Sequence, residues 1–213
     1  MTPKTKPLNP RKQPRQARSA ATIEVILEAA ARILESDGLA AFNTNAVAAK
    51  AGVSIGSLYQ YFPSKEALLA EWIRIERSKL ADAIAQHSIA AETADFDTMV
   101  DGFIDAAIHH QLERPRLAAT LEYIENSLPI AEETAALKQA INNDVARTLV
   151  RFGIAQPELA AQDLSALTRG MVDTAGMLGE TDRDSLKHRV RRAIYGYLQK
   201  PLPAAAKTEN PAD

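Results

Sequence analysis

Residues 42–62 read FNTNAVAAKAGVSIGSLYQYF, and this stretch decides the fold of the N-terminal part of the chain. Thr44 is a favoured N-cap residue for a helix of about seven residues, and Gly52 permits the tight turn after it. Ser54 is a second favoured N-cap residue, so another helix is expected to begin directly after the turn. Two short helices joined by a turn that contains glycine form a helix-turn-helix.

The inward side of these two helices is small and apolar. Ala48 and Ala51 let the two helix axes approach closely, and Val53 fills the angle between them. Leu58 and Phe62 lie one turn apart, which makes them the inward positions of the second helix. The motif is therefore expected to have a small core of its own.

The outward side of the second helix carries the residues that are expected to bind DNA. In a helix-turn-helix its N-terminal part enters the major groove, where serine and glutamine pair with base edges and isoleucine packs on a thymine methyl. Gly56 costs the helix about 1 kcal/mol, which a close approach of the backbone to DNA explains. The candidate DNA contacts, including adjoining phosphate contacts, are Thr44, Lys50, Ser54, Ile55, Gly56, Ser57, Tyr59, Gln60, Tyr61 and Lys65. Two alternatives stay open: Gln60 touches only phosphate or water, and Tyr59 and Tyr61 are core aromatics.

Charge is segregated along the chain, although the net charge is only −2. Residues 1–66 contain nine Lys or Arg against five Asp or Glu, whereas residues 67–213 contain sixteen against twenty-two. A basic end on an acidic body is typical of nucleic-acid binding, because the basic end faces a polyanion. The alternative is a solvated basic tail.

The remaining pattern is helical between two tails. Prolines and a scarcity of apolar residues predict a disordered basic arm over 1–15, and 201–213 is likewise predicted to be a disordered tail. Between them apolar residues recur every three or four positions, and no alternating β pattern of useful length occurs. The pattern predicts an all-α protein of nine helices, with a DNA-binding domain over 16–66 and a helical body over 67–200.

Residues 51–68, AGVSIGSLYQYFPSKEAL, resemble the signature of the tetracycline-repressor-type (TetR) family of transcriptional regulators nearly residue for residue. The resemblance implies a three-helix head on a body that binds an effector and dimerises. It also implies a repressor that leaves a palindromic operator when a small, mainly apolar ligand binds. One departure concerns Asn43 and Ala46, where the family often has a threonine and a basic residue. One phosphate contact is therefore expected to be missing, with Lys50 or the basic arm as its substitute.

The implied effector pocket has no signature of its own in this sequence. Its candidates are polar or aromatic residues that interrupt apolar stripes, namely Met99, Phe103, His110, Tyr123, Arg169 and Met171. The alternative is that the methionines and aromatics are plain core. His109, His110 and Glu113 are not expected to bind a metal, because adjacent helical histidines point about 100° apart.

The last two helical segments are the candidate dimer interface. They carry two apolar seams, and the resemblance implies that they pair with the same helices of a second copy in a four-helix bundle. The interface candidates are Leu164, Leu167, Met171, Val190 and Ile194. The alternative is that these residues form only the core within one chain.

Several function classes are disfavoured by what the sequence lacks. With no cysteine there is no disulfide, thiolate zinc site or cysteine nucleophile. No apolar run approaches a membrane span and no signal-peptide pattern follows the basic N-terminus, so a cytoplasmic protein is expected. No P-loop, dinucleotide-binding turn or catalytic-triad context is visible, so neither an enzyme nor a cofactor is expected. The expected partners are double-stranded operator DNA, a second copy and a small-molecule effector; a ligand-dependent activator and an effector-free DNA-binding protein remain alternatives.

Overall fold

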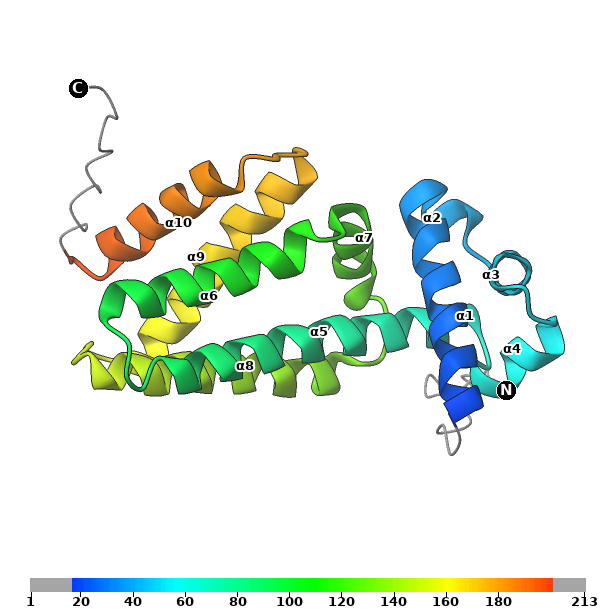
Figure 1. Cartoon of the computed structure of the whole chain (residues 1–213), viewed down its shortest axis with the longest axis horizontal. Coiled ribbons are helices and arrows are strands. Elements are labelled where there is room, and N and C mark those ends of the chain that lie inside the picture. The colour runs from blue at the N-terminus through cyan, green and yellow to red at the C-terminus, as the bar shows by residue number, and fades with distance from the viewer. Residues whose placement is uncertain (1–16, 201–213) are drawn as a thin grey trace, which may run out of the picture.

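The computed structural model describes residues 17–200, and every regular element in that range is a helix (Figure 1). The helices are α1 (Ala17–Ser36), α2 (Gly38–Ala41), α3 (Thr44–Ala51), α4 (Ile55–Tyr61), α5 (Lys65–Ala90), α6 (Phe96–Leu112), α7 (Pro115–Glu125), α8 (Ala131–Arg151), α9 (Pro157–Met177) and α10 (Arg183–Tyr197). The all-α prediction is confirmed. The described range holds ten helices rather than the nine expected, because α2 is a single turn and too short to show apolar periodicity. The expected arm, 1–15, and tail, 201–213, lie outside the described residues.

Local sequence signals account for the short N-terminal helices. Ser54 Oγ accepts a hydrogen bond from Ser57 N at 3.0 Å, and Ser64 Oγ accepts one from Ala67 N at 3.2 Å, so both serines cap the helices that follow them. Gly52 adopts a left-handed φ of 67° after α3, as the turn requires.

The N-cap of α3 is Asn43, and the assignment of Thr44 to that position was wrong. Asn43 is extended, with φ −151° and ψ 161°, and its Oδ1 accepts from Ala46 N at 2.9 Å. Thr44 is instead the first residue of the helix. Asparagine and threonine both cap helices well, so only the backbone geometry distinguishes the two positions.

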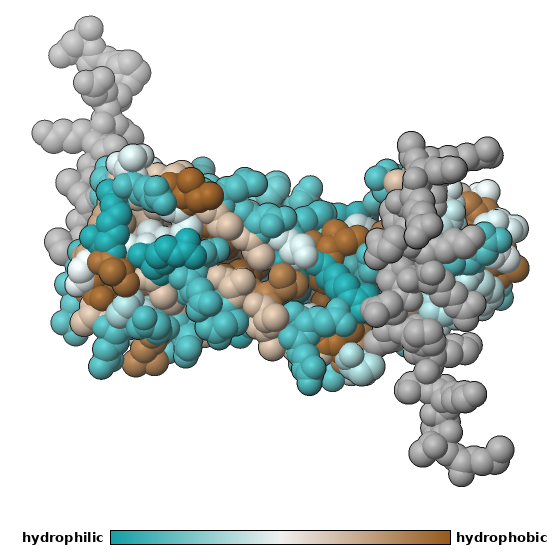
Figure 2. All heavy atoms as spheres, turned by 90° about the horizontal axis from the view of Figure 1, so that it is seen from below, coloured by the Kyte–Doolittle hydropathy of each residue, from teal (hydrophilic) through white to brown (hydrophobic). Residues whose placement is uncertain are grey.

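Helices α1 to α4 form the head, and α5 runs from the head along the whole body (Figure 1). In the body α5 packs along α8 and α6, and α9 packs against α6, α8 and α10. Figure 2 shows one face of the molecule, on which hydrophobic side chains form separate patches among hydrophilic ones. No helix within residues 17–200 combines the length and apolar character that crossing a membrane requires.

The core of the head does not end at the expected boundary after residue 66. Its buried cluster continues into the first turns of α5, with Leu68, Trp72 and Ile73, and includes Leu117 and Leu121 of α7. A second buried cluster occupies the rest of the body. The start of α5 and α7 therefore belong to the same packing unit as the head.

Polar contacts add to this connection, at a joint formed by Leu27, Glu28, Glu35, Trp72 and Arg114. Arg114 Nε and Nη2 donate to the two carboxylate oxygens of Glu35 at 2.7 and 2.6 Å, and its Nη1 donates to Glu28 at 2.9 Å. Trp72 Nε1 donates to the Leu27 carbonyl at 2.8 Å, and the Arg114 guanidinium lies 5.6 Å from the Trp72 ring centroid. The joint fixes α1 to both α5 and the N-terminus of α7.

Candidate nucleic-acid interface and cavity

The recognition face, defined as Ile55, Gly56, Tyr59 and Gln60, is the outward side of α4. All four residues are exposed, with Ile55 at 38% and Tyr59 at 39% exposure. Leu58 on the opposite side of the helix is fully buried, as is Phe62 directly after it. The expected division of this helix into inward and outward positions is confirmed.

Gly56 has room for a side chain within the chain itself. A Cβ atom added there would lie 3.8 Å from Ser54 Oγ, which is ordinary van der Waals contact. Packing inside the head therefore does not require glycine at this position. The helix-propensity cost of glycine remains consistent with an external surface that approaches the backbone.

Four of the candidate DNA contacts already have partners within the head, in two pairs. Ser54 Oγ and Ser57 Oγ form a hydrogen bond of 2.8 Å, and Ser57 is only half-exposed. Thr44 Oγ1 and Tyr59 OH lie 3.1 Å apart, which ties the first residue of α3 to the middle of α4. A hydroxyl of either pair must share or exchange its hydrogen bond in order to contact DNA.

Cations lie on either side of the recognition helix. Lys50 in the last turn of α3 and Lys65 at the start of α5 are both exposed, and neither forms a salt bridge within residues 17–200. Tyr61 is half-buried and packs against the core of the head. Two exposed cations that flank the recognition helix in the sequence, together with its exposed face, are the features that phosphate and base contacts require.

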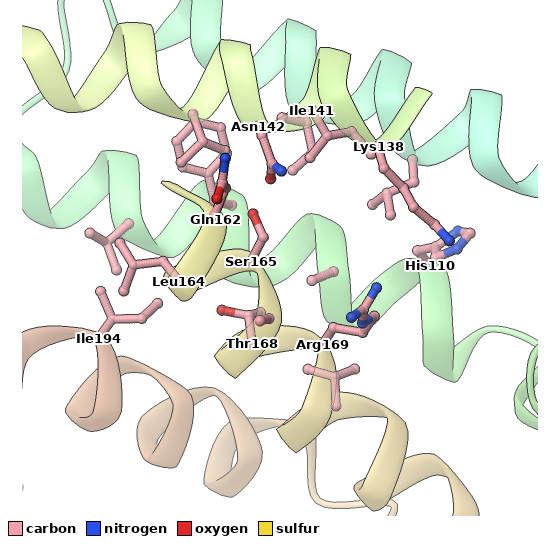
Figure 3. Close-up of a pocket in the computed structure, with 18 of the residues that line it drawn as sticks. His110, Lys138, Ile141, Asn142, Gln162, Leu164, Ser165, Thr168, Arg169 and Ile194 are labelled. Carbon is pink, nitrogen blue, oxygen red and sulfur yellow. The ribbon is translucent and has the colours of Figure 1, made fainter. Parts of the chain in front are cut away.

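A cavity of about 280 Å³ lies in the body between α5, α6, α8 and α9 (Figure 3). Most of its wall is apolar. The apolar side chains that line it are Leu80, Ile84, Met99, Val100, Phe103, Ala107, Ile141, Val145, Leu149, Leu164, Ala166, Val172, Ile194 and Leu198. Its size is at the lower end of the range for small-molecule sites.

Four of the six pocket candidates from the sequence line this cavity: Met99, Phe103, His110 and Arg169. Tyr123 does not, because it lies on the outer side of α7 with 81% of its surface exposed, while Leu121 and Ile124 take the inward positions. Met171 is half-buried and packs against the body core outside the cavity. Tyr123 and Met171 therefore do not line this cavity.

Sequence reasoning missed most of the polar lining. The missed residues are Arg77, Gln111, Lys138, Asn142, Gln162, Ser165, Thr168 and Asp173. A usable signal existed in α9, where Gln162, Ser165, Arg169 and Asp173 recur at helical spacing and form a polar stripe. Figure 3 shows Asn142 pointing into the space from α8, with Ser165 and Arg169 pointing into it from α9.

Glu125 holds two of the cavity cations at one end. Arg77 Nη2 donates to Glu125 Oε2 at 2.6 Å, and Lys138 Nζ donates to Oε1 at 2.9 Å. Burial raises the pKa of Glu125, but the hydrogen bonds from Arg77 and Lys138 outweigh burial and lower the pKa to about 2. Glu125 is therefore ionised at neutral pH.

Asp173 behaves in the opposite way. Burial, followed by repulsion from Glu122, raises its pKa to about 7, despite the opposing effect of Arg169. At neutral pH Asp173 thus carries a proton in a large fraction of molecules, and Arg169 lacks a full counter-charge.

The two adjacent histidines have separate carboxylate partners. His109 Nε2 lies 3.6 Å from Glu113, and His110 Nδ1 lies 3.6 Å from Glu76. Burial lowers the pKa of His110, although Glu76 opposes that effect. Residues 17–200 contain no group of three or more His, Asp or Glu side chains placed to hold a metal ion.

Three of the five candidate interface residues are covered within one chain. Leu164, Val190 and Ile194 are each at most 6% exposed, because α9 and α10 turn them towards the body core. Within one chain these three side chains leave little surface for a second copy, so their place in a dimer interface stays a prediction. Leu167 and Met171 are half-buried, and whether they contact a second copy stays a prediction.

The outer side of α9 is the better interface candidate. Asp163, Gly170, Thr174 and Met177 are exposed at helical spacing, opposite the buried side, and Met177 is 69% exposed. A Cβ atom added at Gly170 would meet nothing within 4 Å. Leu178 at 80% and Tyr197 at 41% extend the exposed apolar area towards α10.

Comparisons with known proteins agree with this architecture. Residues 26–72 match the family model described as bacterial regulatory proteins, tetR family, and residues 95–198 match the tetracyclin repressor-like C-terminal domain. The chain is similar to the HTH-type transcriptional repressor KstR of Mycobacterium tuberculosis, with 31% identity over 58% of this chain and 56% of that protein. It is 28% identical to the HTH-type transcriptional regulator BetI of Stenotrophomonas maltophilia, over 86% of this chain and 94% of that protein.

A solved structure supports the fold. The fatty acid degradation regulator FadR from Bacillus halodurans superposes with a TM-score of 0.70, over 89% of this chain and 100% of that chain. Its sequence identity is 18%, so the likeness concerns the fold alone.

Proposed function

The chain belongs to the tetR family of bacterial regulatory proteins, and from this premise we propose that it is a repressor released from a palindromic operator by a small, mainly apolar ligand. Regulators of this family bind operator DNA and act as dimers, and the curated relatives are transcriptional regulators rather than enzymes. The observation that carries the proposal is the exposed recognition face of α4, with free cations at Lys50 and Lys65.

The recognition face supplies the sequence preference in this proposal. Ile55 and Gln60 present an apolar and a hydrogen-bonding side chain to the major groove, and Tyr59 extends between them. Lys50 and Lys65 bind phosphates and fix the register of the head on the duplex. Thr44, Ser54, Ser57 and Tyr61 contribute through the hydrogen bonds and packing that orient the face.

A dimer supplies the symmetry of the operator. Two recognition helices related by a two-fold axis meet successive major grooves when they are about 34 Å apart. The outer side of α9, centred on Gly170, is proposed as the contact between the two copies, because it exposes small and apolar residues that one chain leaves uncovered.

The cavity favours an effector-responsive protein over an effector-free one. A body that served only as a dimerisation module would not need a mainly apolar space of about 280 Å³ with hydrogen-bonding groups from several helices. Ligand binding regulates DNA only if the ligand prefers the body conformation in which the two recognition helices are wrongly spaced. The α5 helix and the joint connect the cavity to the head.

Selection of genomic fragments by the full-length protein tests the DNA half of the proposal. Fragments that share an inverted repeat are expected, with affinity at least about 10³-fold above that for random DNA. Gln60→Ala should weaken binding to the selected site much more than binding to random DNA, whereas Lys79→Ala, on the body part of α5, should change neither. Selected fragments that bind no more tightly than random DNA would refute an operator-binding repressor.

A further inference from the structure

The polar groups of the cavity point to the chemistry of its ligand. Asn142, Gln162, Ser165 and Thr168 line the space, and within residues 17–200 their side chains make no hydrogen bond to protein. Asn142, Ser165 and Thr168 are half-buried and Gln162 is exposed, so their side chains are open to hydrogen bonds with the oxygen or nitrogen atoms of a ligand that fills the space. The ligand is therefore amphipathic rather than purely apolar.

The charge of the lining selects an anion. The cavity is lined by three permanent cations, Arg77, Lys138 and Arg169, and by one acid, Asp173. Glu125 supplies a single negative charge to both Arg77 and Lys138, and Arg169 makes no salt bridge within the described chain. The protein thus provides more positive than negative charge around the space.

The cations reach the same cavity from different helices. Figure 3 shows the Arg169 side chain rising from α9 into the space, with Lys138 from α8 and His110 from α6 at the same end. Apolar side chains of α6 and α8, among them Met99, Phe103 and Leu149, line the remainder. A molecule with one charged end and one apolar end matches this distribution.

We propose that the cavity binds a small amphipathic carboxylate, with the carboxylate held by Arg169 and Lys138 and the apolar part packed against α6 and α8. The proposal rests on the effector role inferred above and names the chemical class of the effector. Guanidinium and carboxylate form charge-assisted hydrogen bonds that an alcohol cannot replace in strength. A space of about 280 Å³ corresponds to about nine water-sized volumes, which suits a molecule of about ten non-hydrogen atoms.

Binding of the carboxylate also bears on regulation. Lys138 holds Glu125, the last residue of α7, while the N-terminus of α7 lies at the joint, where Arg114 binds Glu28 and Glu35. A ligand carboxylate competes with Glu125 for Lys138, so α7 loses one of the two cations that hold its C-terminal end. Movement of α7 reaches α1 directly through Arg114.

Calorimetric titration of the full-length protein with octanoate, 1-octanol and octylamine tests the ligand class, since the three probes differ only in the polar end. Octanoate is expected to bind at least tenfold more tightly than the other two. Arg169→Met should remove this advantage and leave octanol binding unchanged, and Arg169→Lys should retain most of it. Arg147→Met is the matched control, because Arg147 is an exposed arginine of α8 that pairs with Asp144 outside the cavity.

The outcomes separate the ligand class from the regulatory role. Equal affinity for octanoate and octanol, no octanoate binding, or an equal loss in the Arg147→Met control overturns the carboxylate site. Preference for octylamine overturns it too and assigns the cavity to cations at Asp173. Octanoate binding that depends on Arg169 but leaves affinity for the selected DNA unchanged supports the ligand class and refutes release by effector.

Discussion

Replacing Arg114 with methionine tests the joint between head and body. The change removes three charge-assisted hydrogen bonds, two to Glu35 and one to Glu28, and keeps an unbranched apolar side chain against the Trp72 ring. The Arg114 and Glu35 side chains are 28% and 27% exposed and that of Glu28 is 42% exposed, so solvent weakens the pairs without removing them. The expected loss lies between the energy of an exposed ion pair and that of a buried charged hydrogen bond, and we expect the unfolding free energy to fall by about 2 kcal/mol.

Urea unfolding at a fixed protein concentration measures this loss, with fluorescence of Trp72 as the probe, since it is the chain's one tryptophan. With an m-value of about 3 kcal/mol/M, the midpoint should fall by about 0.7 M. Arg116→Met is the matched control, because Arg116 is exposed and makes one 3.3 Å hydrogen bond to the Glu35 carbonyl. Its effect should stay below about 0.5 kcal/mol.

A double-mutant cycle assigns the effect to the pair itself. Combining Arg114→Met with Glu35→Gln should cost about 1 kcal/mol less than the sum of the two single changes. A coupling energy near zero, or an Arg116→Met loss as large as that of Arg114→Met, would refute the reasoning that ion pairs hold α7 to α1.

Four further predictions concern charge and assembly. The pKa of Glu125 is about 2 against an ordinary 4.5, which stabilises the fold above pH 4.5 by about 3 kcal/mol, and this contribution is lost as pH falls towards 2. In Glu125→Gln the unfolding free energy should therefore change less with pH over this range. The raised pKa of Asp173 means that ionising this group costs stability as pH rises, so Asp173→Asn should stabilise the protein increasingly from about pH 4 to pH 7 in urea melts. A difference in unfolding free energy between variant and parent that does not change with pH would contradict the raised pKa. Lys65→Ala should reduce the salt slope of operator binding by about 2 per dimer in anisotropy titrations; an unchanged slope would remove Lys65 from the phosphate contacts. A glutamine at Gly170 fits within a single chain, so Gly170→Gln should shift the protein to monomer in sedimentation only if the outer side of α9 is the interface. The control Ala140→Gln, at an exposed position of α8, should leave the dimer unchanged, and an unaltered dimer in Gly170→Gln would place the interface elsewhere.

Features that depend on residues close together in the sequence could be predicted, and features that depend on distant residues could not. The turn at Gly52 and the caps at Ser54 and Ser64 depend on residues within four positions, so the helix-turn-helix was predictable almost completely. The cap at Asn43 was missed because two adjacent residues have similar capping strength.

The body shows where this kind of prediction ends. An apolar seam such as Leu164 with Ile194 looks the same in sequence whether its partner is another helix of the chain or a second copy, and here it is the chain itself. The ends of the Arg114–Glu35 pair are 79 positions apart, which no local pattern can indicate. For the polar lining that was missed, the polar stripe of α9 was the readable signal.

The continuous core beneath the head has a consequence for building chimeric regulators. Leu68, Trp72 and Ile73 of α5 and Leu117 and Leu121 of α7 pack in the same cluster as α1 and α3. A graft that ends after residue 66 would leave one side of the transplanted head packed against the α5 and α7 residues of the recipient protein, which do not match it. Exchange of DNA specificity between relatives should therefore succeed when the graft includes the start of α5 and the facing side of α7, or when only the recognition face of α4 is replaced and the packing beneath it is left intact.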